Sequence, residues 1–168
     1  NRAITGLGFQ PDVVIVKGNA AQVAVIRTST ITGDNTKPFG STALTADMIQ
    51  SLDSDGFTIG TNASVNSNTV SYYWAAFKAV AGELVVGSYS GNGTSQSITG
   101  LGFQPEYVIV MAATNRYPVQ RSSSMTKSYQ FDGDAGALLR VTSLDSDGFS
   151  VGNSSQVRAA LDVLKRVD

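Results

Sequence analysis

Residues 4–16 read ITGLGFQPDVVIV, and residues 98–110 read ITGLGFQPEYVIV. A second match follows in the same order, because SLDSDGF occupies both 51–57 and 143–149. The offset is 94 residues for the first pair (98 − 4) and 92 for the second (143 − 51). Two long matches in one order indicate a tandem duplication. The repeat is too long for a solenoid unit or a propeller blade and has the size of a small independent β-domain.

Short apolar runs separated by Gly, Asn and Asp turns predict strands along both copies. Asp12–Lys17 and Glu106–Met111 are almost continuously apolar, which is typical of strands covered on both faces. Val70–Ala79 is the most aromatic stretch, and its residues alternate between two faces. We therefore expect an all-β protein of two tandem antiparallel β-sandwich modules, jelly-roll-like, over residues 1–81 and 82–168.

The ends of the two copies differ. Copy two opens with ELVVGSYS at Glu83–Ser90, whereas copy one has only Asn1–Ala3 before its first motif. Copy one closes with VSYYWAAFKA at Val70–Ala79, whereas the helix-favouring residues of Gln156–Val167 predict a short helix at the end of copy two. A sandwich that lacks a strand exposes a hydrogen-bonding edge. Either the copies complete one another, or a neighbouring chain donates the strand.

Composition excludes several classes of function. Charged residues make up 15% of the chain and the net charge is −1, so no basic surface for nucleic acid is expected. Histidine and cysteine are absent, which removes a Ser-His-Asp triad, a thiol nucleophile and the commonest zinc ligands. No apolar run is long enough to insert in a membrane. Because the chain opens on Asn1 without a signal-peptide pattern, we expect a processed product or a piece of a longer chain.

The two Asp-Ser-Asp-Gly segments are the sharpest chemical feature. Asp53 with Asp55, and Asp145 with Asp147, place two carboxylates two residues apart, as in a Ca²⁺-binding loop. The alternative is a tight turn in which Asp accepts hydrogen bonds from backbone amides and Gly takes an unusual conformation. The recurrence of the segment in two identical contexts favours the turn. A glycosidase pair of acids is disfavoured for the same reason, and no other cofactor is expected.

The aromatic run Tyr72, Tyr73 and Trp74 has two interpretations. Aromatic faces bind pyranose rings, so the three side chains could form a sugar-binding platform. Core packing is the favoured alternative, because Trp74 is followed by the small residues Ala75 and Ala76.

The remaining repeated residues are assigned structural roles. The GLGF strings fail the dinucleotide-binding pattern because a strand, not a helix, follows them, and we expect Phe9 and Phe103 to close one end of each sandwich. Arg27 and Arg121 recur at matching places and are predicted either to bind an acidic ligand or to form a surface salt bridge.

The order GFQPDVVIVKG, SLDSDGFTIG and VNSNTVSYYWAAFKA resembles a module of bacteriophage tail-fibre-like and bacterial cell-surface proteins. The matching positions are Gly8–Lys17, Ser51–Gly60 and Val65–Ala79, with Gly102–Met111 and Ser143–Gly152 in copy two. The resemblance implies an accessory surface domain without catalytic residues. Copy two departs from the pattern by lacking the closing aromatic strand.

Together these observations predict a non-catalytic structural or adhesive module on a virion surface or in an extracellular assembly. A capsid decoration protein, a fibre segment and a filament subunit all fit this description. We expect a homo-oligomer, or assembly with other virion or surface proteins, through β edges. The alternative is a carbohydrate-binding module with glycan ligands. No nucleic-acid partner and no membrane insertion are expected.

Overall fold

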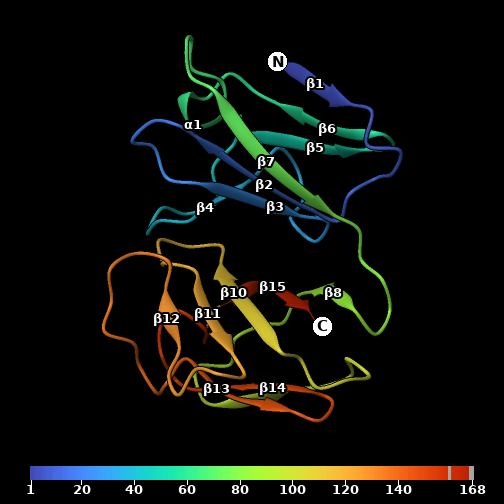
Figure 1. Ribbon diagram of the computed structural model, residues 1–168. Helices are drawn as coiled ribbons and strands as arrows, with labels where there is room; N and C mark the ends of the chain where they lie inside the picture. The colour runs from blue at the N-terminus through green and yellow to red at the C-terminus, as the bar shows by residue number, and fades with distance from the viewer. Residues whose placement is uncertain (159, 167–168) are drawn as a thin grey trace. The chain divides into compact units, whose positions relative to one another are not determined.

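Every pair of strands in the described part of the chain is antiparallel. The computed structural model describes residues 1–158 and 160–166 (Figure 1). It divides into two compact units, Asn1–Ala79 and Val80–Asp168. Each unit is an antiparallel β-sandwich of two sheets, which confirms the all-β prediction.

The first unit contains seven strands and one short helix within the described residues. Their bounds are β1 Arg2–Thr5, β2 Val13–Gly18, β3 Val25–Thr28, β4 Lys37–Pro38, β5 Ile49–Asp53, β6 Gly56–Ile59, α1 Ala63–Asn66 and β7 Tyr72–Phe77. The strand order is β1-β6-β5 in one sheet and β4-β3-β2-β7 in the other.

The second unit repeats this order with one strand added at its beginning. The bounds are β8 Leu84–Gly87, β9 Gln96–Ile98, β10 Tyr107–Ala112, β11 Val119–Ser122, β12 Tyr129–Gln130, β13 Val141–Asp145, β14 Gly148–Val151 and β15 Ala160–Arg166. The orders are β13-β14-β9 and β12-β11-β10-β15-β8. Strand β8 therefore extends the larger sheet of this unit beyond β15.

An apolar core lies between the two sheets of each unit. Alternation along β2 turns Val14 and Val16 inward, where they pack with Phe57 and Ile59 of the facing sheet. The buried cluster of the second unit is built from corresponding positions: Val108, Val110, Val119, Val141, Phe149 and Val151.

The repeated glycine of each Asp-Ser-Asp-Gly segment is required by a close backbone approach. A Cβ atom on Gly56 would lie 1.9 Å from the carbonyl oxygen of Ile4, and one on Gly148 would lie 1.9 Å from that of Ile98. In each unit this glycine sits where the hairpin meets the unit's first repeated strand. Only a residue without a side chain fits there.

The helix predicted over Gln156–Val167 is wrong, because Ala160–Arg166 forms strand β15 and Val167 lies outside the described residues. Strand β15 pairs with β10 on one side and β8 on the other. The helix preference of a few Ala, Leu and Lys residues is small, and two ladders of backbone hydrogen bonds override it. Within the described residues, no helix has the length and apolar character needed to cross a membrane.

Candidate functional site

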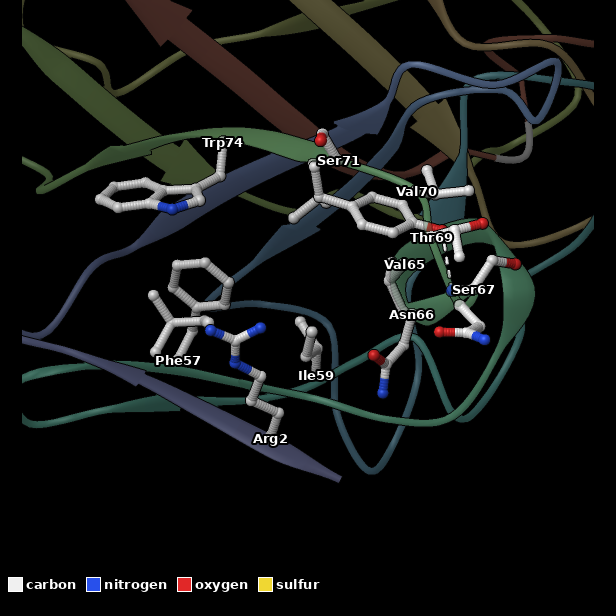
Figure 2. Close-up of a pocket in the computed structure, with 14 residues that line it drawn as sticks. Arg2, Phe57, Ile59, Val65, Asn66, Ser67, Thr69, Val70, Ser71 and Trp74 are labelled. Atoms are coloured by element: carbon white, nitrogen blue, oxygen red, sulfur yellow. Dashed lines mark hydrogen bonds between the residues drawn. The ribbon is translucent and has the colours of Figure 1, made fainter.

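A pocket of about 690 Å³, here called the edge pocket, opens between the two sheets of the first unit (Figure 2). Strand β1 contributes Arg2 and Ile4 to its wall, and β7 contributes Tyr72 and Trp74. The rest of the lining consists of apolar core side chains and the polar loop 66–71. Of the described residues that line it, Arg2 alone is charged.

Trp74 is the largest side chain of the edge pocket. Figure 2 shows its ring above that of Phe57. The two rings meet edge to face, with centroids 5.6 Å apart and an interplanar angle of 74°. The indole is nevertheless 47% exposed. The core-packing interpretation therefore accounts for only part of this residue, and the remaining surface is available to a ligand or partner.

Tyr72 fixes the loop that borders the pocket. Its hydroxyl donates to the carbonyl oxygen of Ala63 (2.8 Å) and accepts from the amide of Ser67 (3.0 Å). In the same loop Thr69 has φ of +65°, which is unusual for a β-branched residue. The loop is thus held in a specific shape against the end of α1.

The three aromatic residues do not form one platform. Tyr72 and Trp74 face the edge pocket, whereas Tyr73 points to the opposite face of the sheet and is 68% exposed. A sugar stacked on Trp74 would not reach Tyr73.

Strand β7 also offers a row of backbone groups. The carbonyl oxygens of Ser71 and Phe77 accept bonds from Asn19 (3.0 Å) and Asp12 (2.8 Å) at the two ends of the β2–β7 ladder. Because hydrogen-bonding direction alternates along a strand, the N–H and C=O groups of Trp74 and Ala76 point away from β2. No strand of the described residues pairs with this outer edge of β7.

The two edges of this sheet differ in protection. The β4 edge is only two residues long, Lys37 and Pro38, and a short strand and a proline each discourage pairing. Strand β7 has six residues, YYWAAF, without a charge or a proline. Of the two edges of this sheet, the β7 edge is therefore the one better suited to pair with an additional strand.

The second carboxylate of each turn ties the hairpin to the glycine-rich loop. Asp55 accepts bonds from the amides of Gly8 (2.6 Å) and Gly6 (3.0 Å), and these bonds lower its pKa. Asp147 is placed identically, accepting from Gly102 at 2.7 Å and Gly100 at 3.0 Å.

The first carboxylate of each turn bonds within its own hairpin. Asp53 accepts from the Thr58 hydroxyl at 2.8 Å, and Asp145 accepts from the Ser150 hydroxyl at 2.8 Å. The described residues contain no group of three or more His, Cys, Asp or Glu side chains placed to hold a metal ion. The turn interpretation explains all four aspartates through protein donors.

The surface salt bridge predicted for Arg27 is wrong, and the acidic ligand predicted for this residue stays a prediction. Its side chain is 7% exposed, and burial lowers its pKa. The guanidinium donates to backbone carbonyls, including those of Gly33 (2.7 Å) and Ile49 (3.1 Å). Arg121 likewise donates to two carbonyls of β13, at 2.8 Å each. Each arginine therefore links its own strand to the backbone of the next sheet, Arg27 to β5 and Arg121 to β13.

Sequence reasoning missed most of the edge pocket, including Arg2 and the loop 66–71. A signal for it exists in the repeat, because residues 1–79 contain no match to the ELVVGSYS segment at 83–90. No protein-family model, curated protein or solved structure matches the chain.

Proposed function

We propose that the chain is a non-catalytic structural or adhesive module that assembles through β edges, with copies of itself or with other surface proteins. One observation carries the proposal. The first unit presents a six-residue strand edge without a charge or proline, beside a pocket lined by a half-exposed tryptophan. Main-chain pairing supplies affinity at such an edge, and neighbouring pockets supply specificity.

The chemistry of the edge pocket supports a binding role over catalysis. Its lining contains serine hydroxyls at Ser67 and Ser71 but no carboxylate, and the chain has no histidine or cysteine. A serine nucleophile needs a neighbouring base to remove its proton. Arg2, the one charged group there, is not such a base.

The location proposed for the assembly is a virion surface or the outside of a cell. The resemblance of the three sequence motifs to tail-fibre-like and cell-surface modules supports it. The low charge content, 15%, and the Gly-, Ser- and Asn-rich composition fit a β-rich surface protein.

Sedimentation velocity over a wide concentration range, followed by negative-stain imaging of the purified chain and of its native source, tests this proposal. We expect concentration-dependent oligomers, or regular particles decorated or built by the chain. A chain that stays monomeric at every concentration and is found on no assembly in its source would contradict the proposal.

Carbohydrate binding is the second candidate, and the exposed face of Trp74 beside the polar loop 66–71 favours it. A glycan array tests it. Binding lost in Trp74→Ala and kept in Tyr73→Ala would support a sugar site in the edge pocket, because Tyr73 lies on the other face. An array without hits would remove this candidate.

A further inference from the structure

In the second unit, strand β8 lies at a position that no described strand fills in the first unit. Strand β15 corresponds to β7, since both pair with the central GFQP strand of their unit. On its other side β15 pairs with β8, with Val163 opposite Gly87 and Lys165 opposite Val85. The corresponding positions on β7 are Trp74 and Ala76, whose backbone groups point outward.

Tyr89 follows two residues after the end of β8 and belongs to the same segment. Its ring meets that of Phe149 edge to face at 6.4 Å, and its hydroxyl donates to the carbonyl oxygen of Val157 at 2.6 Å. Burial raises the pKa of the Tyr89 hydroxyl. The tyrosine thus closes the side of the second sandwich between β15 and β9.

The residues around Tyr89 have counterparts that line the edge pocket. Tyr89 packs against a cluster that contains Phe149, Val151 and Val157 and is flanked by Ile98. At the repeat offset of 92 residues, Phe149, Val151 and Val157 correspond to Phe57, Ile59 and Val65. At the offset of 94 residues, Ile98 corresponds to Ile4. All four of these first-unit residues line the edge pocket.

We propose that the outer edge of β7 and the edge pocket bind an extended segment with the chemistry of residues 83–90, ELVVGSYS, as an added antiparallel strand. In this register the leucine lies opposite Phe77 and the glycine opposite Trp74, and the tyrosine enters the edge pocket. The glycine leaves room for the indole across the strand pair. The inference rests on the proposed function, because it names the partner chemistry and the site of the edge assembly.

Hydrogen-bond directions along β8 give this register a testable detail. Leu84 and Val80 exchange both backbone bonds, at 2.9 and 3.0 Å, so the backbone groups of Leu84 face away from β15. By alternation those of Val86 also face away, and those of Val85 and Gly87 face β15. In a segment bound to β7 in the same register, the backbone groups at the Val85 position form hydrogen bonds with β7. The amide at the Val86 position then points toward solvent.

Two other occupants satisfy fewer of these features. A sugar stacked on Trp74 would leave the backbone groups of Trp74 and Ala76 unpaired. Two β7 strands paired edge to edge would place no side chain like Tyr89 in the edge pocket. An ELVVGSY-type strand fills both the edge and the pocket.

The test is titration of the full chain with the blocked synthetic peptide ELVVGSYS. Trp74 is the only tryptophan, so its fluorescence reports the first unit alone and is not affected by strand exchange at β15. We expect a saturable blue shift, and at least about tenfold weaker binding when the peptide tyrosine is replaced by alanine. N-methylation of the peptide at Val85 should abolish binding, and N-methylation at Val86 should leave it within about threefold.

A protein variant adds an independent arm. Ala76→Pro removes an outward-facing N–H while keeping the bonds between β7 and β2, which an edge strand tolerates. The variant should melt cooperatively and no longer bind the peptide. If it does not fold, the two N-methylated peptides still decide the matter on the unchanged protein.

The possible results separate the hypotheses. No binding of the parent peptide, equal effects of the two N-methyl groups, or a Trp74 response to glycans but not to peptide would each overturn the inference. A dimer lost in Ala76→Pro without peptide binding would replace the proposed segment by a second β7 strand. Assembly without peptide binding refutes only this site, whereas peptide binding by a chain that never assembles refutes only the proposed function.

Discussion

Strands β7 and β15 occupy corresponding places in the two units, yet β7 ends its sheet and β15 lies inside one. Both pair antiparallel with the strand that follows the GFQP turn. Among the described strands, β15 has a further partner, β8, on its far side, and β7 has none. Whether this strand position is an interior or an edge is therefore decided by a segment outside the shared motif.

The aromatic side chains beside these two strands also differ in how far they cover the core of their unit. In the second unit Tyr89 covers Phe149, whereas in the first unit Trp74 touches Phe57 from β7 itself and stays half exposed. One unit closes its own side, and the other presents that side as a pocket beside a strand edge. Two units with the same strand order can therefore share the same core positions and still differ in how one side of the sandwich is covered.

The largest expected effect tests whether the two hairpins are equivalent. Gly56→Ala and Gly148→Ala should each destabilise their unit by more than about 3 kcal/mol, because the new Cβ collides with a backbone oxygen that cannot move alone. Denaturant unfolding followed by Trp74 fluorescence for the first unit, and by circular dichroism for both, measures the two losses. Tolerance of alanine in one unit and not in the other would break the correspondence.

The next effect concerns the aromatic that closes each unit. Tyr89→Ala should cost about 2–4 kcal/mol, since it removes a mostly buried ring and opens a pocket in the second unit. Trp74→Ala should cost about 1–2 kcal/mol, because half of the indole is already in solvent. Chemical unfolding monitored by circular dichroism compares them. Equal costs would mean that Trp74 closes its unit as well as Tyr89 does.

Alkaline pH should affect the two units in opposite directions. Burial lowers the pKa of Lys37 to about 8, so the folded first unit loses this proton before the unfolded chain does. Its stability should rise between pH 8 and the ordinary lysine value of 10.5. Burial raises the pKa of Tyr107 to about 12 from 10.0, so the second unit should lose stability as pH rises through that interval.

Unfolding midpoints measured by Trp74 fluorescence and by circular dichroism across this pH range check both trends. Lys37→Met should remove the rise, and Tyr107→Phe should reduce the fall while Tyr89 still contributes to it. A first unit that weakens steadily from pH 8 upward would contradict the assignment of Lys37.

The smallest effect concerns acid. The amides of Gly8 and Gly6 lower the pKa of Asp55, so its contribution to stability is present above the ordinary aspartate pKa and is lost as pH falls through the folded value. Asp55→Asn should reduce the dependence of the first unit's melting temperature on acid pH. Thermal melts of the variant and of the parent chain between about pH 2 and 6 measure this.

The effect of Ca²⁺ on thermal stability tests whether the same carboxylates bind a metal ion. Because protein donors explain all four turn aspartates, the melting temperature should be the same with Ca²⁺ and with EDTA. A midpoint raised by Ca²⁺ and unresponsive in Asp55→Asn would restore the metal interpretation.

Predictions from local sequence were accurate where local chemistry decides the structure. The all-β class and the Asp-Ser-Asp-Gly turns follow from alternation and turn residues. The faces of β7 also follow, since Tyr72 and Trp74 line the edge pocket and Tyr73 lies on the opposite face. The helix expected at the end of copy two was wrong, because residues far away in sequence supply the partners that make β15 a strand.

The sequence by itself determined the repeated strand-and-turn framework, since apolar periodicity and turn-forming residues act over a few residues. Tertiary structure alone decided that Asp55 binds amides up to 49 residues away, that Arg27 is buried among carbonyls, and that β7 is left as an edge beside a pocket. Those outcomes depend on which distant segments meet in the fold. The residues of a single strand do not specify which other strand its backbone will pair with.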